Sequence, residues 1–371
     1  MKPYLTILLD SFRMLKAKTI FWVTLGISLL VAVIYLSMGF DEKGATLFFG
    51  LVPIENEVFR KGTPQAEKLY VTLFTKLIAE YWLSWIAVLL ALISCSSIFT
   101  ESLKEGAAGM ELTKKLSRWQ VFVAKFAGSL LFVLIQVGLF VLIVFLALRW
   151  RVGSWNFSIF WYVPLILLVF SYLYSFMVLV AVKTRSSMTA LVLTLVLWGL
   201  SSFIGYIEGQ FYSVIKIQKT LQGYEQEAAE MAQPEGSDDE APDSAEEEET
   251  AESVTVVHGP DEAVTASMER WYQGLVAVYG IFPKTGRTME VADRLLVING
   301  ERGIAKGTFM SIMMDMSLEE EEEEDDYAKD FVKTAEMLTE RHSTAYAIGT
   351  SSAFAFVMLL LAGWIFCRKE I

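Results

Sequence analysis

Residues 100–125 read TESLKEGAAGMELTKKLSRWQVFVAK, and this charged stretch separates two long apolar runs. It contains five basic residues against three acidic ones, and Gly106 and Gly109 interrupt a continuous helix in its first half. Short polar segments rich in Lys and Arg are typical of the cytoplasmic side of a membrane protein. The stretch therefore predicts a cytoplasmic hairpin between two membrane-spanning helices.

The composition of the whole chain agrees with a location in a bilayer. Of the 371 residues, 54% are hydrophobic, 13% aromatic and only 20% charged, which is too apolar for a soluble domain of this length. Six apolar runs are long enough to cross a hydrocarbon core of about 30 Å at about 1.5 Å per residue. The predicted fold is an all-α integral membrane protein with spans at Ile20–Phe40, Tyr81–Phe99, Phe126–Leu148, Ser158–Val182, Met188–Ile207 and Ala345–Phe366.

The distribution of Lys and Arg predicts the orientation of these spans. Segments 1–19, 100–125, 183–187 and 367–371 together contain 13 basic and 5 acidic residues, and six spans place all four on one side. The short segments on the other side contain 7 basic and 6 acidic residues. Because basic loops remain inside, we expect a protein of the cell membrane, that is, the cytoplasmic or inner membrane, with both termini in the cytoplasm.

The first of these segments, residues 1–19, places apolar residues at helical spacing with charged residues on the other faces. This pattern predicts an amphipathic helix at the membrane surface that leads into the first span. A soluble helix that packs on a partner is the alternative reading of the same pattern. Residues 20–207 then contain spans one to five, residues 343–366 the sixth span, and residues 367–371 a cytoplasmic tail.

Residues 208–342 form a different kind of region, with 32 acidic and 11 basic residues, whereas the rest of the chain is basic. In the predicted orientation they are an exterior insertion between spans five and six. Residues 228–253 nearly lack apolar side chains and cannot offset the entropy of ordering, so we expect a disordered spacer. Residues 254–317 regain aromatic and aliphatic side chains and are expected to form a small cap. The acidic run 319–326 is expected to be a solvated segment rather than a cation site.

Several kinds of functional group are missing from the sequence. None of the six predicted spans contains Asp, Glu, Lys, Arg or His, which disfavours a proton- or ion-coupled transporter. The chain has no Walker phosphate loop, GxxxxGK followed by Ser or Thr, and no HExxH. His258 and His342 lie far along the chain from Cys95, so we expect no metal, no bound cofactor and no enzyme activity on this chain. Work done by the spans must then be driven by another chain.

The order of these features resembles the permeases of the type-2 ABC exporter family, which are membrane subunits of ATP-binding cassette transporters. The resemblance rests on the amphipathic N-terminal segment, the polar loop after the second span, the basic turn 183–187 and the Arg-Lys-acid ending. It covers the membrane portions of the chain. One departure is Lys115, because relatives often have Pro shortly before the Ser-Arg pair of this loop.

In that family a separate ATPase subunit docks on the loop after the second span. The resemblance therefore implies a permease subunit, in an exporter, that pairs with a second copy or a sibling and is driven by cytosolic subunits carrying ATP and Mg. The residues that it places at the ATPase-coupling loop are Glu105, Gly106, Ser117, Arg118 and Lys125. The lipid bilayer is the other expected partner, and nucleic acid is not expected. On chemistry alone, Arg118 and Lys125 are also suited to anchor the third span at the lipid headgroups.

A function of another class stays open as the alternative. The chain could be a non-transporting membrane scaffold or sensor whose acidic exterior region binds a partner. Deleting residues 228–253 separates the two functions. Loss of a binding partner with ATPase association intact would favour the sensor, whereas retained transport would reduce the segment to a tether.

Overall fold

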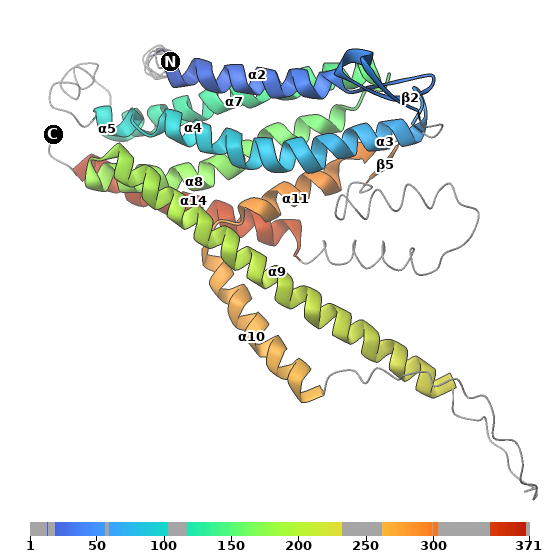
Figure 1. Ribbon diagram of the computed structural model, residues 1–371. Coiled ribbons are helices and arrows are strands. Elements are labelled where there is room, and N and C mark those ends of the chain that lie inside the picture. Colours follow the sequence, from blue (N-terminus) through green and yellow to red (C-terminus); the bar gives the residue numbers. More distant parts are fainter. Residues whose placement is uncertain are drawn as a thin grey trace, which may run out of the picture. The chain divides into compact units, whose positions relative to one another are not determined.

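The computed structural model describes residues 13, 19–55, 59–102, 117–231, 262–298, 300–302 and 342–368. This part of the chain is mostly helical, and six of its helical segments are long and apolar enough to cross a membrane, as predicted (Figure 1). These segments are Thr19–Ser37, Pro64–Glu101, Arg118–Arg151, Phe157–Thr184, Ser187–Lys219 and Thr344–Arg368. Most of the predicted N-terminal helix and residues 103–116 of the polar loop lie outside the described residues.

The second spanning segment begins at Pro64 and not, as the sequence predicted, at Tyr81. The Thr63 hydroxyl accepts a hydrogen bond from the Ala66 N–H, and Pro64 occupies the first turn, where its missing N–H is tolerated. The segment continues through α3 (Pro64–Leu73), the π-helical η2 (Phe74–Ala87) and α4 (Val88–Cys95), and a two-residue turn joins α4 to α5 (Ile98–Ser102). Lys76 and Glu80 therefore belong to a candidate span, and the expectation of uncharged spans is wrong for this segment.

The first span, α2 (Thr19–Ser37), is followed by a small antiparallel sheet. Its strands are β1 (Gly39–Asp41), β2 (Gly44–Leu47) and β3 (Val52–Glu55), with the short η1 (Phe48–Gly50) between the last two. Two buried tyrosines fix the end of α2 to α3. The Tyr35 hydroxyl donates to the Tyr70 carbonyl at 3.0 Å, and the Tyr70 hydroxyl donates to the Tyr35 carbonyl at 3.1 Å.

The third and fourth spans are joined by a short connection. Helix α7 (Arg118–Arg151) is followed by η3 (Phe157–Trp161) and α8 (Tyr162–Thr184). Helix α8 is the most enclosed span and packs on α7 and on α14 (Thr344–Arg368), the sixth span. Hydroxyl groups cross these interfaces, as in the 2.7 Å contact between Ser129 and Tyr174 and the 3.3 Å contact between Tyr172 and Ser352. Because lipid offers no hydrogen-bond partners, such pairs satisfy polar groups inside the bundle.

The fifth span belongs to a long helix, α9 (Ser187–Met231), so residues 228–231 of the predicted spacer are helical. Residues 232–253 lie outside the described residues. After them come α10 (Glu262–Ile281), α11 (Thr285–Leu295) and the paired strands β4 (Val297–Ile298) and β5 (Glu301–Arg302).

The chain forms two compact units, and the predicted cap, residues 254–317, is divided between them. One unit contains residues Met1–Gly205 and Tyr279–Ile371, and the other contains Tyr206–Val278. In the smaller unit, the Tyr272 hydroxyl donates to the Glu208 carboxylate at 3.0 Å, and exposed Lys219 pairs with Glu269. Helix α11 belongs to the larger unit, where it packs on α8, η2 and α14.

Candidate functional site

The structure places three of the five predicted coupling residues at or near the beginning of α7. Ser117 caps the helix in a capping box with Gln120, and Arg118 is the first helical residue. Lys125 lies two turns inside the helix and is only 3% exposed. Glu105 and Gly106 lie outside the described residues.

Arg118 also reaches the end of the sixth span. Its guanidinium donates to the Cys367 carbonyl at 3.4 Å, which links the first residue of α7 to the last turn of α14. Carbonyl groups in the last turn of a helix lack an intrahelical partner and carry partial negative charge. The arginine is therefore well placed to hold these two helix ends together.

Next to this contact, five aromatic side chains from four elements pack together, and we call them the aromatic block. Phe99 of α5 lies 5.3 Å from Phe122 of α7 and 6.3 Å from Phe366 of α14, measured between ring centroids. Trp119 stacks on Phe122 at 5.5 Å, and Tyr174 of α8 lies 6.4 Å from Phe99. Since α5 ends at Ser102 and α7 is capped by Ser117, both described ends of the polar loop are fixed on this block.

One residue of α14 has to be glycine for the block to close. A Cβ atom on Gly363 would lie 1.9 Å from the Trp119 ring, far inside the van der Waals contact distance. The indole therefore packs directly on the backbone of α14. Close approach of this kind is how small residues strengthen helix pairs in membranes.

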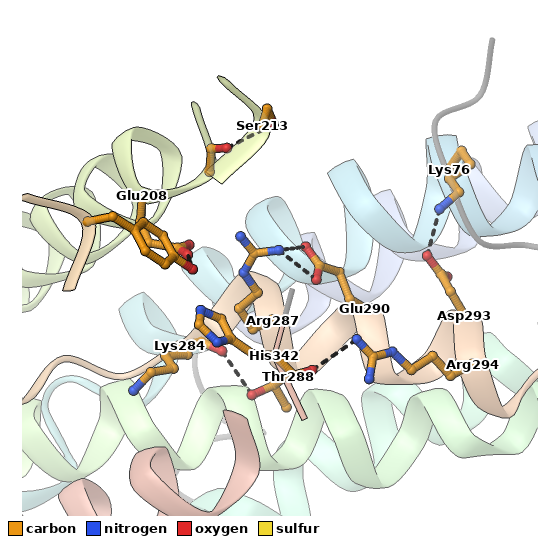
Figure 2. Close-up of polar contacts among 12 residues, drawn as sticks. Lys76, Glu208, Ser213, Lys284, Arg287, Thr288, Glu290, Asp293, Arg294 and His342 are labelled. Carbon is orange, nitrogen blue, oxygen red and sulfur yellow. Dashed lines mark hydrogen bonds and ion pairs between the residues drawn. The ribbon is translucent and has the colours of Figure 1, made fainter. Parts of the chain in front are cut away.

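Charged groups gather at the other end of the bundle, around α11. Lys76 of η2 and Asp293 of α11 form an ion pair with 2.6 Å between Nζ and Oδ2, and both side chains are largely buried (Figure 2). The Tyr162 hydroxyl at the beginning of α8 donates to the other carboxylate oxygen of Asp293 at 3.3 Å. Three elements thus meet at one carboxylate.

Neighbouring charges on α11 continue this row. The Nη1 atom of Arg287 donates to both carboxylate oxygens of Glu290 at 2.9 Å, one turn before Asp293 (Figure 2). Burial raises the pKa of the Asp293 carboxyl above its ordinary value, and the Lys76 ammonium opposes that rise. Glu290 adds to the rise through repulsion. The Lys76–Asp293 pair is therefore held against a desolvation penalty.

The beginning of α11 is inserted deeply between the spans. Lys284, fully buried, donates from its ammonium to the Thr350 hydroxyl at 2.8 Å, and its backbone N–H donates to Ser351 at 2.9 Å. Ser351 lies about 10 Å along the α14 axis from Thr344, at about 1.5 Å per residue. The Trp198 indole of α9 donates to Thr285 at 3.2 Å. Lys284, which the sequence assigned to the exterior region, therefore lies buried beside residues of the sixth candidate span.

The end of α11 is fastened as well. Asn156, before η3, donates to the Val297 carbonyl at 2.6 Å, and the Val297 N–H donates to Ser158 at 3.0 Å. Arg294 donates to the His342 carbonyl at 3.1 Å, next to the start of α14 (Figure 2). Helix α11 is therefore held at its beginning, middle and end by elements that belong to the spanning segments or adjoin them.

The two clusters lie at opposite ends of the bundle. Tyr162, in the first turn of α8, contacts Asp293, whereas Tyr174 of the same helix contacts the aromatic block. Their separation along the helix is about 18 Å at about 1.5 Å per residue. A movement of α8 would therefore change contacts both around Asp293 and in the aromatic block.

Sequence reasoning missed the cluster around α11 for a definite reason. Lys76 and Asp293 are 217 positions apart, and neither lies in a predicted span. Two local signals were present: Arg287, Glu290 and Asp293 recur at intervals of three on one helical face, and Lys76 and Glu80 are spaced by four. These intervals predict aligned charges but not which segments meet.

Among the described residues, no group of three or more His, Cys, Asp or Glu side chains is arranged to hold a metal ion. No protein-family model matches the chain, and no curated protein is significantly similar to it.

Replacing Lys76 with Met is expected to lower the free energy of unfolding by about 3 kcal/mol, because it leaves the buried Asp293 carboxylate without its counter-charge. Adding Asp293→Asn to Lys76→Met should recover at least about 1 kcal/mol of this loss. Unfolding in detergent, followed by circular dichroism, measures both changes. The control is Lys219→Met, which removes one partner of an exposed ion pair and should change little. Equal effects of Lys76→Met and Lys219→Met would contradict a supporting role for the buried pair.

The pH dependence of the Lys76→Met variant follows from the sign of the Asp293 shift. A carboxyl with a raised pKa in the folded state binds protons more tightly there than in the unfolded chain, so folding gains as the pH falls through the raised value. Removing Lys76 removes the main influence that opposes the rise. The stability deficit of Lys76→Met should therefore shrink between about pH 8 and about pH 5, relative to the double variant, which lacks the carboxyl. A deficit that stays constant in this range would contradict a charged Asp293 as its cause.

Replacing Gly363 with Ala is expected to destabilise the protein by about 1 to 3 kcal/mol, because the new methyl group overlaps the Trp119 ring. Trp119→Leu should relieve most of this loss in the double variant. Gly349→Ala is the matched control on the same helix, since a Cβ atom there meets no atom within 4 Å. The control should be neutral or slightly stabilising. Thermal unfolding of the two Ala variants and of the double variant tests the contact, and equal behaviour of the two Ala variants would refute it.

Proposed function

We propose that this chain is the permease subunit of an ATP-binding cassette exporter, driven by ATP hydrolysis on a separate cytosolic subunit. The observation that carries the proposal is the aromatic block. It joins α5, α7, α8 and α14 at the place where both described ends of the polar loop emerge. A force applied to that loop would reach four elements of the bundle together, as an input from a second protein requires.

In the proposed orientation, this end of the bundle faces the cytoplasm and both termini lie inside. The excess of Lys and Arg in segments 1–19, 100–125, 183–187 and 367–371 supports this sidedness. The α11 end then faces the exterior of the cell membrane. A second copy of the chain, or a sibling, would complete the translocation path.

The proposed coupling begins at Arg118. Its position at the first turn of α7, with a hydrogen bond to the end of α14, lets it contact a docked subunit and move two spans as one body. A guanidinium forms forked bonds to carboxylates, which suits a protein interface. ATP and Mg belong to the partner in this mechanism.

The proposed exit is closed by α11. This helix packs on α8, η2 and α14. Lys76 and Tyr162 bind its residue Asp293, and Asn156 binds Val297 in the strand that follows. Opening a path to the exterior would require α8 or η2 to move relative to α11. The ion pair with Asp293 sets the energy needed for that movement.

A second candidate function is transport coupled to a proton or another ion, and the buried Lys76–Asp293 pair with its Tyr162 contact favours it. Ionisable groups in spanning segments often mark ion or proton pathways. In this case the chain would work without an ATPase. The two functions therefore differ in whether a nucleotide-hydrolysing partner is needed.

Purification of the tagged chain from its native membrane separates the candidates. We expect an ATP-binding cassette subunit with a Walker phosphate loop to be recovered with the wild-type chain, in roughly equal amount. Arg118→Glu should reduce its recovery at least about tenfold, because repulsion replaces attraction at the docking face. The measurement is quantitative mass spectrometry of the purified complex.

The control variant is Arg185→Glu, which reverses one charge in the exposed turn after α8 and leaves the start of α7 intact. It should recover the ATPase like the wild-type chain. Absence of any such subunit from the wild-type preparation would count against the exporter and leave ion-coupled transport and the scaffold or sensor. Equal recovery of the ATPase subunit with Arg118→Glu and Arg185→Glu would show that Arg118 is not part of the coupling site.

A further inference from the structure

A shallow apolar groove runs along the surface between the beginning of α7 and the end of α14. Its volume is about 590 Å³, and it is lined by Trp119, Leu360, Leu361, Trp364 and Cys367. We call it the α7–α14 groove. The two leucines and the two indoles are all more than 40% exposed. The groove is therefore open along the side of two candidate membrane spans.

Two arginines contact the residues that line this groove. The Arg118 guanidinium donates to the Cys367 carbonyl, and the Arg368 guanidinium lies 4.1 Å from the centre of the Trp364 ring. Arg118 is the first residue of α7 and Arg368 the last of α14, so both charges stand at the same end of the groove. Tryptophan and arginine together are typical of the level where acyl chains meet headgroups.

We propose that the α7–α14 groove binds an anionic phospholipid, with an acyl chain on the apolar lining and the phosphate beside Arg118 and Arg368. The lining has almost no polar surface, which suits a hydrocarbon chain. Among the described residues, the two arginines that contact the lining lie at the same end of it. Basic pockets between membrane helices recognise anionic headgroups in this way. The proposal does not depend on the proposed transport function.

Charge also argues against a second copy of this chain as the occupant. A two-fold symmetric contact on this groove would place the same patch on both subunits. The arginine pair of one copy would then face the arginine pair of the other, and like charges disfavour such an interface. A phosphate instead has the charge opposite to that of the two arginines.

The test uses the purified full-length chain without any ATPase, in detergent, titrated with dioleoyl phosphatidylglycerol or dioleoyl phosphatidylcholine and followed by native mass spectrometry. We expect the anionic lipid to bind the wild-type chain at least about tenfold more tightly than the zwitterionic one. The double variant Arg118→Gln/Arg368→Gln should lose this preference. The matched double variant Lys183→Gln/Arg185→Gln removes two charges from the turn after α8, outside the groove, and should keep it.

A groove-filling variant tests the apolar part separately. Leu361→Trp places a larger side chain in the groove and should weaken binding of both lipids at least about fivefold while keeping the preference for phosphatidylglycerol. Equal affinity of the wild-type chain for the two lipids would overturn the proposal, as would equal behaviour of the two double variants. A change in oligomeric mass with Leu361→Trp, at unchanged lipid binding, would assign the groove to a second copy instead.

Discussion

The ion pair between Lys76 and Asp293 is the interaction on which one end of the bundle depends. It joins the second spanning segment to a helix that the chain reaches only after the fifth, and it brings the beginning of α8 in through Tyr162. Burying two charges is unfavourable unless each finds its partner with good geometry. The position of α11 is therefore specified by charge, whereas apolar packing against α8 would tolerate small shifts along the helix.

The opposite end of the bundle is organised by different chemistry. There the contacts are aromatic rings, a glycine against an indole, and one arginine at a helix end. The packed rings hold the helix ends as a body through many contacts, whereas an ion pair is either made or broken. In the proposed mechanism, a push on the aromatic block would open the bundle by separating the charge contact at the other end.

The number and approximate positions of the spans could be predicted from the sequence because twenty-residue apolar runs are a strong local signal. The start of α7 also has a local signal in the sequence, since Ser117 and Gln120 form a capping box within one turn. The predicted start of the second span was wrong because Lys76 and Glu80 look like solvent-facing residues in the sequence. Only the structure shows that Lys76 pairs with Asp293 of α11. Residues such as Lys284 and Asp293 were assigned to an exterior cap for the same reason: long-range pairing leaves no periodic trace in one sequence.

The most direct test of the proposed mechanism is hydrogen–deuterium exchange of α11 in the complex of this chain with the proposed ATPase subunit, without nucleotide and with trapped ATP. If closure of the ATPase is passed through the aromatic block to the α11 end, amides of residues 285–295 should exchange at least about tenfold faster in the ATP state. Arg118→Glu should abolish this difference. Unchanged exchange of α11 in a complex that hydrolyses ATP would contradict the mechanism.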